Sequence, residues 1–287
     1  MTLTAQEATD RADYAAQAKG HVRWGHWVVG AVLLVLVAQL ARFLVFNEAF
    51  EWNVVGEYLF DSSVLKGLGT TILLAVAAML VGLLLGTTIA ACRLSAFVPL
   101  RWAGTAYVTV FRSIPPLVQL IFWFNLGYLL PKISVGIPFG PEFASWSSND
   151  LITPVTAAVL GLGLNEAAYL AEIVRGGLLG VDTGQQEAAK SLGYSGWQTF
   201  SRVTMPQAMR TIIPPTGSQF ITVLKGTSLV SVIAMADLLY SVQTIYGRTY
   251  QVVPLLIVAV LWYLLVVSVF SLGQQRLEKY FGRGANR

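Results

Sequence analysis

The sequence predicts an all-α membrane protein with about six transmembrane helices. Hydrophobic residues make up 55% of the 287 residues and charged residues only 12%, and the mean hydropathy is +0.63. So few charges are typical of a polytopic membrane protein rather than of a soluble domain of this length. Six apolar stretches are long enough, or nearly so, to cross a bilayer: 27–46, 68–91, 114–130, 151–175, 212–240 and 252–271.

Four regions follow from the order of these stretches. A polar, alanine-rich segment precedes the first stretch, an acidic and aromatic segment follows it, and basic residues gather after the last. The predicted regions are 1–25, a cytosolic N-terminal tail; 26–63, a transmembrane span with its outer loop; 64–272, the main transmembrane domain, which contains a cytosolic loop at 175–211; and 273–287, a basic cytosolic C-terminal tail.

Glycines are concentrated in or beside the second stretch, at Gly67, Gly69, Gly82 and Gly86. Small residues let the backbones of membrane helices approach one another closely. We therefore expect a neighbouring helix to pack against this stretch.

Basic residues are distributed unevenly between the two sides of the predicted membrane. With Met1 inside and six crossings, most arginines and lysines lie inside, and only Lys66, Lys132 and Arg248 lie outside. Cytosolic segments of membrane proteins carry such an excess of positive charge. The pattern predicts that both termini and the loop 175–211 face the cytosol. It also accounts for the net charge of +4 without a nucleic-acid partner.

The polar segment 181–215 contains start and stop signals for a first short helix. Thr183 and Gln186 have the spacing of a capping box, in which two side chains satisfy free N–H groups at a helix start. Gly193 follows as a terminator, because glycine readily adopts the left-handed conformation that closes a helix.

A second set of signals follows directly. Ser195 and Gln198 repeat the capping-box spacing, and Pro206 is expected to stop or kink the helix that they begin. Two short amphipathic helices between membrane spans are suited to dock in a cleft of a partner protein. The alternative is an ordinary cytosolic loop.

A further pattern runs through the same segment: Glu187-Ala188-Ala189, three residues, Gly193, nine residues, then Val203-Thr204-Met205-Pro206. It resembles the EAA motif of ABC importer permeases, from which Val203 and Met205 are mild departures. Three other segments, in the same order as in those proteins, resemble the polar amino acid subfamily: 111–120, 165–177 and 224–233.

This resemblance implies a five-helix type I permease core, to which the stretch 27–46 is an extra N-terminal span. It also implies a place in a bacterial cytoplasmic (inner) membrane and three kinds of protein partner. These are a dimer of ATP-binding ABC subunits, which would hold ATP and Mg; a second permease subunit, identical or homologous; and an extracytoplasmic solute-binding protein. The residues expected to couple to the ATPase are Gly184, Glu187, Ala188, Ala189, Gly193 and Pro206.

Polar residues inside two predicted spans suggest a substrate path, since an ionisable group in a membrane usually faces a partner or a watery cavity. Asn165, Tyr169 and Glu172 share one helical stripe, with Glu166 beside it. A second stripe lies on the span 212–240. We hypothesise that the two stripes face each other or a dimer axis; the second contains Ser218, Thr222 and Lys225, followed by Thr227 and Ser228.

Structural ion pairs are the alternative explanation of these charges. Glu172 and Arg175 have the i, i+3 spacing of a helical ion pair. Lys225 is a candidate for a structural ion pair with a carboxylate. In the substrate-path hypothesis, the carboxylate of Glu166 and the ammonium group of Lys225 bind a zwitterionic ligand.

The sequence lacks the phosphate-binding loop of ATPases, a zinc-type Cys/His spacing and a nucleophile elbow. We therefore expect no catalytic residue, metal or cofactor in this chain, and expect ATP hydrolysis in a separate subunit. The predicted function is that of a permease subunit that moves a polar amino acid, or a relative such as an opine, into the cytosol by alternating access. The alternatives are an ion-coupled secondary amino acid transporter and a membrane-embedded enzyme.

Overall fold

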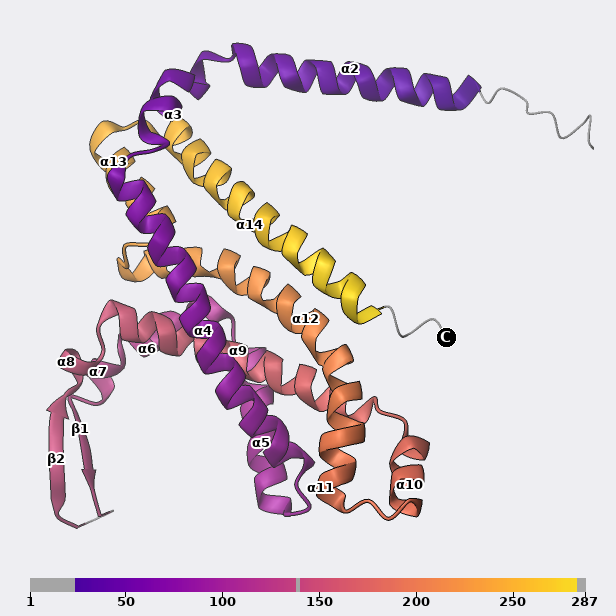
Figure 1. Cartoon of the computed structure of the whole chain (residues 1–287). Coiled ribbons are helices and arrows are strands. Elements are labelled where there is room, and N and C mark those ends of the chain that lie inside the picture. Colours follow the sequence, from indigo (N-terminus) through magenta and orange to yellow (C-terminus); the bar gives the residue numbers. More distant parts are fainter. Residues whose placement is uncertain (1–23, 138–139, 283–287) are drawn as a thin grey trace, which may run out of the picture. The chain divides into compact units, whose positions relative to one another are not determined.

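The computed structural model describes residues 24–137 and 140–282, which are mostly helical (Figure 1). The chain divides into two compact units between Glu51 and Trp52. The first unit contains α2 (Trp24–Phe46), in which every residue is exposed, and the 3₁₀ helix η1 (Glu48–Phe50). The predicted span at 27–46 is therefore helical. Residues 1–23, most of the predicted N-terminal tail, lie outside the described residues.

The second unit holds the remaining helices and one β-hairpin. In chain order its elements are α3 (Trp52–Tyr58), α4 (Ser62–Leu94), α5 (Val98–Ser113), α6 (Pro116–Phe124), α7 (Leu126–Leu129), β1 (Lys132–Gly136), β2 (Glu142–Ser147), α8 (Ser148–Leu151), α9 (Pro154–Leu179), α10 (Thr183–Ser191), α11 (Gly196–Thr199), the π-helical turn η2 (Phe200–Thr204), α12 (Met205–Gly226), the 3₁₀ helix η3 (Thr227–Ile233), α13 (Leu238–Thr249) and α14 (Val252–Gly282).

Four helices in the described part of the chain are long and apolar enough to cross a membrane: α2, α4, α9 and α14. Two bent pairs raise the number to six if each pair forms one span. One pair is α5 with α6, at 101°, and the other joins the helical run 196–233 to α13, at 43°. The fold class, an all-α membrane protein with about six spans, is confirmed.

The packing of α4 against α9 organises the second unit. A Cβ at Gly82 would lie 2.9 Å from Glu166 Cβ, and one at Gly86 would lie 2.9 Å from Ala167 O and from Leu170 Cβ. Only glycine lets the two backbones come this close. Since higher residue numbers on α4 match higher numbers on α9, the two helices run in the same direction.

Two further helices, α12 and α14, pack onto this pair and complete the bundle. On α12, Ile212 packs near Gly177 and Gln219 lies near Glu166, so α12 runs opposite to α9. On α14, Phe270 contacts Phe220 with ring centroids 5.0 Å apart. The core of this unit contains the buried Leu74, Leu120, Leu224 and Val230.

The second unit therefore has two distinct ends. At one end lie the start of α4, α13 and the start of α14, which pack around Val64, Val242 and Leu255. A 3.0 Å hydrogen bond from Leu238 N to Thr71 Oγ1 also joins α13 to α4. At the other lie the end of α4, α10 and the end of α14. We call them the Ser62 end and the Leu94 end.

Of the four glycines expected to permit close approach, three do so. A Cβ at Gly67 would overlap Ser241 Oγ and lie 2.6 Å from Asp237 O, and Gly82 and Gly86 meet α9. The prediction for Gly69 is wrong, because nothing lies within 4 Å of a Cβ there. Its face of α4 is turned away from the helices that pack on the other three.

The stretch 114–130, predicted as a span of nearly sufficient length, is not one helix. α6 extends only from Pro116 to Phe124, too short to cross a bilayer alone. It forms a candidate span together with α5, across a bend of 101°. Two consecutive prolines lie at the bend, and neither supplies the backbone N–H that would continue α5.

The predicted outer loop 131–150 contains an antiparallel β-hairpin of β1 and β2. Pairing runs from Lys132 with Ser147 to Gly136 with Glu142, with a register irregularity before Gly136. Polar and β-branched residues alternate through Lys132-Ile133-Ser134-Val135, which is the pattern of a strand. The all-α class thus holds for the spans and not for this connection.

Two other predicted boundaries change. The segment 241–251, which connects the predicted spans 212–240 and 252–271, is largely the helix α13, which begins after the N-cap Asp237 and ends at Tyr250 with φ of 63°. The segment expected to be a tail from residue 273 continues as α14 through Gly282. Residues 283–287 lie outside the described residues.

The close contact of α4 with α9 predicts opposite effects of one added methyl group at two glycines. In Gly86→Ala the new Cβ meets the backbone of α9, so we expect a loss of about 1–3 kcal/mol of stability. In Gly69→Ala the methyl group enters open space, and the higher helix propensity of alanine favours an unchanged or raised stability. Thermal unfolding of the purified protein in detergent measures both. Equal midpoints for the two variants would contradict the packing described here.

Candidate functional site

The first predicted helix of the polar loop is α10, but its N-cap differs from the prediction. Asp182, rather than Thr183, caps it, and the Asp182 carboxylate accepts a 2.7 Å hydrogen bond from Gly184 N. A carboxylate at this position also compensates the positive end of the helix dipole. The capping box of Thr183 with Gln186 was therefore wrong by one residue.

The end of α10 agrees with the prediction. Gly193 has a φ of 83°, Gly193 N donates to Lys190 O at 2.9 Å and Tyr194 N donates to Ala189 O at 3.1 Å. These bonds form a Schellman motif, which satisfies the last carbonyl groups of the helix. A side chain at position 193 would strain this turn.

The exposed surface of α10 carries most of its predicted coupling residues. Gly184, Glu187 and Ala188 are exposed, whereas Ala189 is buried. The small buried side chain lets the helix lie on the unit while the glutamate points to solvent. Directly after α10, Leu192 is 78% exposed, so the described chain leaves a large apolar side chain uncovered here.

The capping box of Ser195 with Gln198 is confirmed. Ser195 N donates to Gln198 Oε1 at 2.8 Å, and Gln198 N donates to Ser195 Oγ at 3.3 Å. Trp197, in the first turn of α11, is 73% exposed and stacks at a tilt on Phe200, 5.8 Å between ring centroids.

Pro206 was expected to stop or kink the second helix, and the structure shows that it does not stop it. The helical run continues from α11 through the π turn η2 into α12, and Pro206 is exposed at the start of α12. In the π turn, Met205 N bonds to Phe200 O, five residues back. The wider turn gives room for the proline ring, which in an α-helix clashes with the carbonyl four residues earlier. The second capped helix is thus the beginning of the next span.

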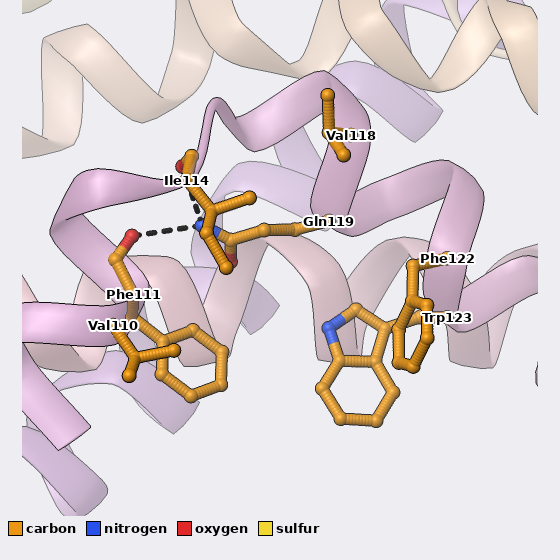
Figure 2. Close-up of a pocket in the computed structure, with 7 residues that line it drawn as sticks. All are labelled: Val110, Phe111, Ile114, Val118, Gln119, Phe122 and Trp123. Carbon is orange, nitrogen blue, oxygen red and sulfur yellow. Dashed lines mark hydrogen bonds between the residues drawn. The ribbon is translucent and has the colours of Figure 1, made fainter. Parts of the chain in front are cut away.

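A bend between α5 and α6 forms a second notable feature (Figure 2). In a continuous helix, Phe111 O would accept from the N–H of residue 115, but this residue is proline. The Gln119 amide replaces that donor: its Nε2 atom lies 2.8 Å from Phe111 O and 2.8 Å from Ile114 O. Asn165 Nδ2 adds a third bond, 3.1 Å to Phe111 O.

Asn165 therefore holds the bend as well as lying on the predicted stripe. Its side chain is 4% exposed, and it joins α9 to the end of α5. An apolar hollow of about 250 Å³ lies beside the bend, lined by side chains including Phe111, Ile114 and Trp123 (Figure 2). Gln119 Oε1 is buried and has no hydrogen-bond partner within the described structure.

The other two residues of the first stripe belong to a charged cluster at the Leu94 end. Glu172 Oε1 lies 2.5 Å from Arg93 Nη1 and 3.9 Å from Arg112 Nη1, and Glu172 Oε2 lies 3.0 Å from Arg175 Nη2. The Arg112 guanidinium lies over the Tyr169 ring, 5.1 Å from its centroid. The predicted i, i+3 pair of Glu172 with Arg175 is confirmed.

Glu166 faces a different neighbour from the rest of its stripe. It is 6% exposed, and its carboxylate accepts a 2.8 Å hydrogen bond from Gln219 Nε2 on α12. Lys225 is exposed, and it forms no ion pair with a carboxylate of the described residues. Within the described residues, the buried carboxylate of Glu166 has no cationic partner.

The second stripe lies on an open face of α12. Ser218, Thr222 and Lys225 are exposed, and Gln274 Nε2 lies 3.3 Å from Ser218 Oγ. The two stripes do not meet within one chain, because Asn165, Tyr169 and Glu172 contact α5 and α4. The last two predicted residues bond to their own helix: Thr227 is fully buried and Ser228 half-buried, with hydroxyls 2.8 and 2.9 Å from Leu224 O and Lys225 O.

Sequence reasoning missed Gln119, Gln219, Arg93 and Arg112. A signal existed for Gln119, because Pro115 leaves the carbonyl of Phe111 without a helical donor. Arg93 and Arg112 were interpreted only as markers of membrane orientation. Their shared contact with Glu172 spans three helices, so no local pattern predicts it.

The charged cluster predicts unequal effects of two arginine substitutions. In Arg93→Gln a 2.5 Å ion pair is lost at a side chain that is 13% exposed, so we expect a stability loss of about 1–3 kcal/mol. In Arg112→Gln the lost contact is 3.9 Å long at a side chain that is 45% exposed, and screening limits the loss to under about 1 kcal/mol. Thermal unfolding in detergent measures both; an equal or reversed order would contradict the geometry.

Comparison with known proteins relates this architecture to one family. Residues 79–282 match the family described as binding-protein-dependent transport system inner membrane component. Over 271 residues the chain is 40% identical to the arginine transport system permease protein ArgU of Corynebacterium glutamicum, covering 92% of this chain and 82% of that protein. It is 34% identical over 237 residues to the glutamate/aspartate import permease protein GltK of Escherichia coli O6:H1, covering 82% and 97%.

The fold agrees with a solved relative. A crystal structure of an amino acid ABC transporter with histidines superposes with a TM-score of 0.66 at 33% identity, covering 76% of this chain and 94% of that one. The chain therefore belongs to the family of binding-protein-dependent transport system inner membrane components; it is an amino acid ABC importer permease and not an enzyme, and the ATPase of such a system is a separate subunit.

Proposed function

We propose that this chain carries a polar amino acid, or a relative such as an opine, into the cytosol by ATP-driven alternating access. A dimer of ATP-binding subunits, which binds ATP and Mg, supplies the work. Closure of that dimer moves α10, and α10 passes the movement to the spans on either side. A ligand or nucleotide shifts such an equilibrium only by binding one state better than the other.

The single observation that carries this proposal is the construction of the loop at the Leu94 end. α10 is capped at both ends by Asp182 and by the Gly193 turn, and it exposes Glu187. It follows α9 directly, and the run through α11 and η2 enters α12 without a break. A short, well-defined helix between two spans is suited to transmit a push; a flexible loop is not.

Three further parts of the assembly are proposed. A second permease subunit, identical or homologous, covers the open face of α12 that carries Ser218, Thr222 and Lys225. An extracytoplasmic binding protein delivers the substrate at the Ser62 end. The system lies in a bacterial cytoplasmic (inner) membrane, with both termini of this chain and α10 in the cytosol.

The proposed substrate class rests on chemistry and on relatives. The relatives cited above are named for arginine and for glutamate and aspartate transport, and these ligands all carry an ammonium group and a carboxylate. Glu166 offers a buried acceptor to the ammonium group, and Lys225 an exposed donor to the carboxylate. Asn165, Tyr169, Glu172, Thr227 and Ser228 support the path by holding its helices.

The coupling role of α10 predicts that two substitutions separate ATP hydrolysis from transport. Glu187→Lys reverses the exposed charge of α10, and Gly193→Trp places a side chain where φ is 83°. We expect each to lower uptake at least tenfold in proteoliposomes that contain the ATPase and the binding protein, because the ATPase is released or hydrolyses ATP without transport.

The matched control is Glu142→Lys, which makes the same charge change at an exposed residue of β2, away from α10. Its uptake and co-purification with the ATPase are expected to stay at the wild-type level. If ATP hydrolysis stays coupled to uptake in both α10 variants, α10 is not the coupling element and the proposal is refuted. Uptake that an ion gradient drives without ATP would refute it as well and would favour a secondary transporter.

The proposed path predicts loss of uptake without loss of assembly. Glu166→Gln keeps the size of the side chain and a partner for Gln219 but removes the negative charge, and Lys225→Met removes the positive one. We expect uptake of a labelled amino acid to fall at least tenfold in each, while the ATPase still co-purifies. Glu57→Gln, an exposed residue of α3, serves as the control. Wild-type uptake in both variants would refute the assignment of Glu166 and Lys225 to the substrate path.

A further inference from the structure

A groove of about 550 Å³ lies at the Ser62 end of the second unit. Side chains from α3, from the start of α4 and from α13 line it, and hydroxyl groups are frequent among them. The lining includes Tyr58, Ser63, Tyr240, Thr244, Arg248 and Thr249.

The groove and α10 lie at opposite ends of the helical bundle. On α4, Ser63 lines the groove, whereas Arg93 pairs with Glu172, about two turns before the end of α9. At 1.5 Å per residue these two positions are about 45 Å apart along α4, more than the thickness of a bilayer core. If α10 meets the cytosolic ATPase, as proposed above, the groove faces the outside.

The groove carries a positive charge that is not compensated within the described chain. Arg248 is exposed, and the ion pairs that the described residues form all converge on Glu172 at the other end. The acidic residues that cap α4 and α13 beside the groove are engaged elsewhere. Asp61 accepts from Ser63 N at 2.8 Å and from the Ser63 hydroxyl, and the buried Asp237 accepts from Tyr240 N at 2.8 Å and from the Tyr263 hydroxyl at 3.3 Å. The Ser63 hydroxyl and its backbone N–H hold the pKa of Asp61 below the usual value.

The hydroxyl groups add donors and acceptors around this charge. The Thr244 hydroxyl lies 2.9 Å from Tyr240 O and that of Thr249 lies 3.2 Å from Ile245 O, so both are positioned by their own helix. A guanidinium group beside fixed hydroxyls is suited to a carboxylate, because charge-assisted hydrogen bonds to carboxylates are strong and directional. The lining of the groove lacks a carboxylate that would receive an ammonium group.

We infer that this groove receives an acidic side chain of the extracytoplasmic binding protein, with Arg248 as its principal contact. The inference rests on the proposed function and adds the place and chemistry of docking. A protein side chain fits better than a free amino acid, because a zwitterion brings an ammonium group for which the groove has no partner. The family to which the chain belongs is defined by dependence on a binding protein.

The test measures how much binding protein is needed to stimulate ATP hydrolysis by the complete importer in lipid nanodiscs. In Arg248→Glu the groove repels a carboxylate, and we expect the half-maximal concentration of substrate-loaded binding protein to rise about tenfold or more. Arg248→Ala is expected to give a smaller rise. In the wild type this concentration increases with salt, and in Arg248→Ala the increase is weaker, because an ion pair at an interface is screened by salt.

Lys66→Glu is the matched control, since Lys66 is an exposed cation on α4, one turn beyond Ser63, that does not line the groove. Its half-maximal concentration is expected to stay within about twofold of the wild type. Unstimulated ATP hydrolysis and thermal unfolding of each variant show whether the complex is folded and assembled.

Two outcomes would overturn the inference. One is an unchanged half-maximal concentration in Arg248→Glu with a folded complex. The other is a change in the response to free amino acid without binding protein, which would assign the groove to the ligand itself. Failure of the proposed function is distinguishable, because it appears as retained coupling in Glu187→Lys, whatever happens at Arg248.

Discussion

The close approach of α4 and α9 is the contact on which the arrangement of the other helices depends. Gly82 and Gly86 remove the side chains that would hold the two backbones apart. This contact fixes the rotation of α9, and the rotation directs Glu166 towards α12 and Glu172 towards the end of α4. The buried carboxylate and the charged cluster are therefore two consequences of one packing surface. In lipid, such close packing replaces the hydrophobic driving force that soluble helices use.

Proline interrupts the helices of this protein in two physically different ways. At Pro115 the chain bends sharply, and side-chain amides of Gln119 and Asn165 take over the free carbonyl of Phe111. At Pro206 the helix stays continuous, because a π turn widens the backbone before the ring. In both places the lost N–H is the cause, and the surrounding residues decide whether the result is a corner or a straight passage.

Local signals in the sequence predicted the polar loop well. The Ser195 and Gln198 capping box and the Gly193 turn involve residues at most five positions apart, so a single segment contains all the information. The N-cap of α10 was missed by one residue, because Asp182 and Thr183 are both good caps and the choice depends on how the chain leaves α9. Helix boundaries at 241–251 and 273–282 were missed for a similar reason: polar composition suggested loops, but packing at either end of α14 sustains helices.

Contacts between helices could not be predicted in the same way. Periodicity placed Asn165, Tyr169 and Glu172 on one stripe correctly, yet it contains no information on which neighbour that stripe meets. Arg93 lies 79 positions from Glu172 in the chain, and no motif links the two. The residue types nonetheless limited the possibilities, since a carboxylate in a span requires a cation, a donor or water nearby.

The passage of the helix across Pro206 has a mechanical consequence. From Gly196 to Gly226 the backbone stays helical without a break, although it curves along α12, where Pro214 and Pro215 lie inside the helix (Figure 1). Because its hydrogen-bonded turns follow one another directly, a displacement of α11 is passed on to the part of α12 that carries Ser218 and Thr222. A loop at residue 206 would have absorbed that displacement instead.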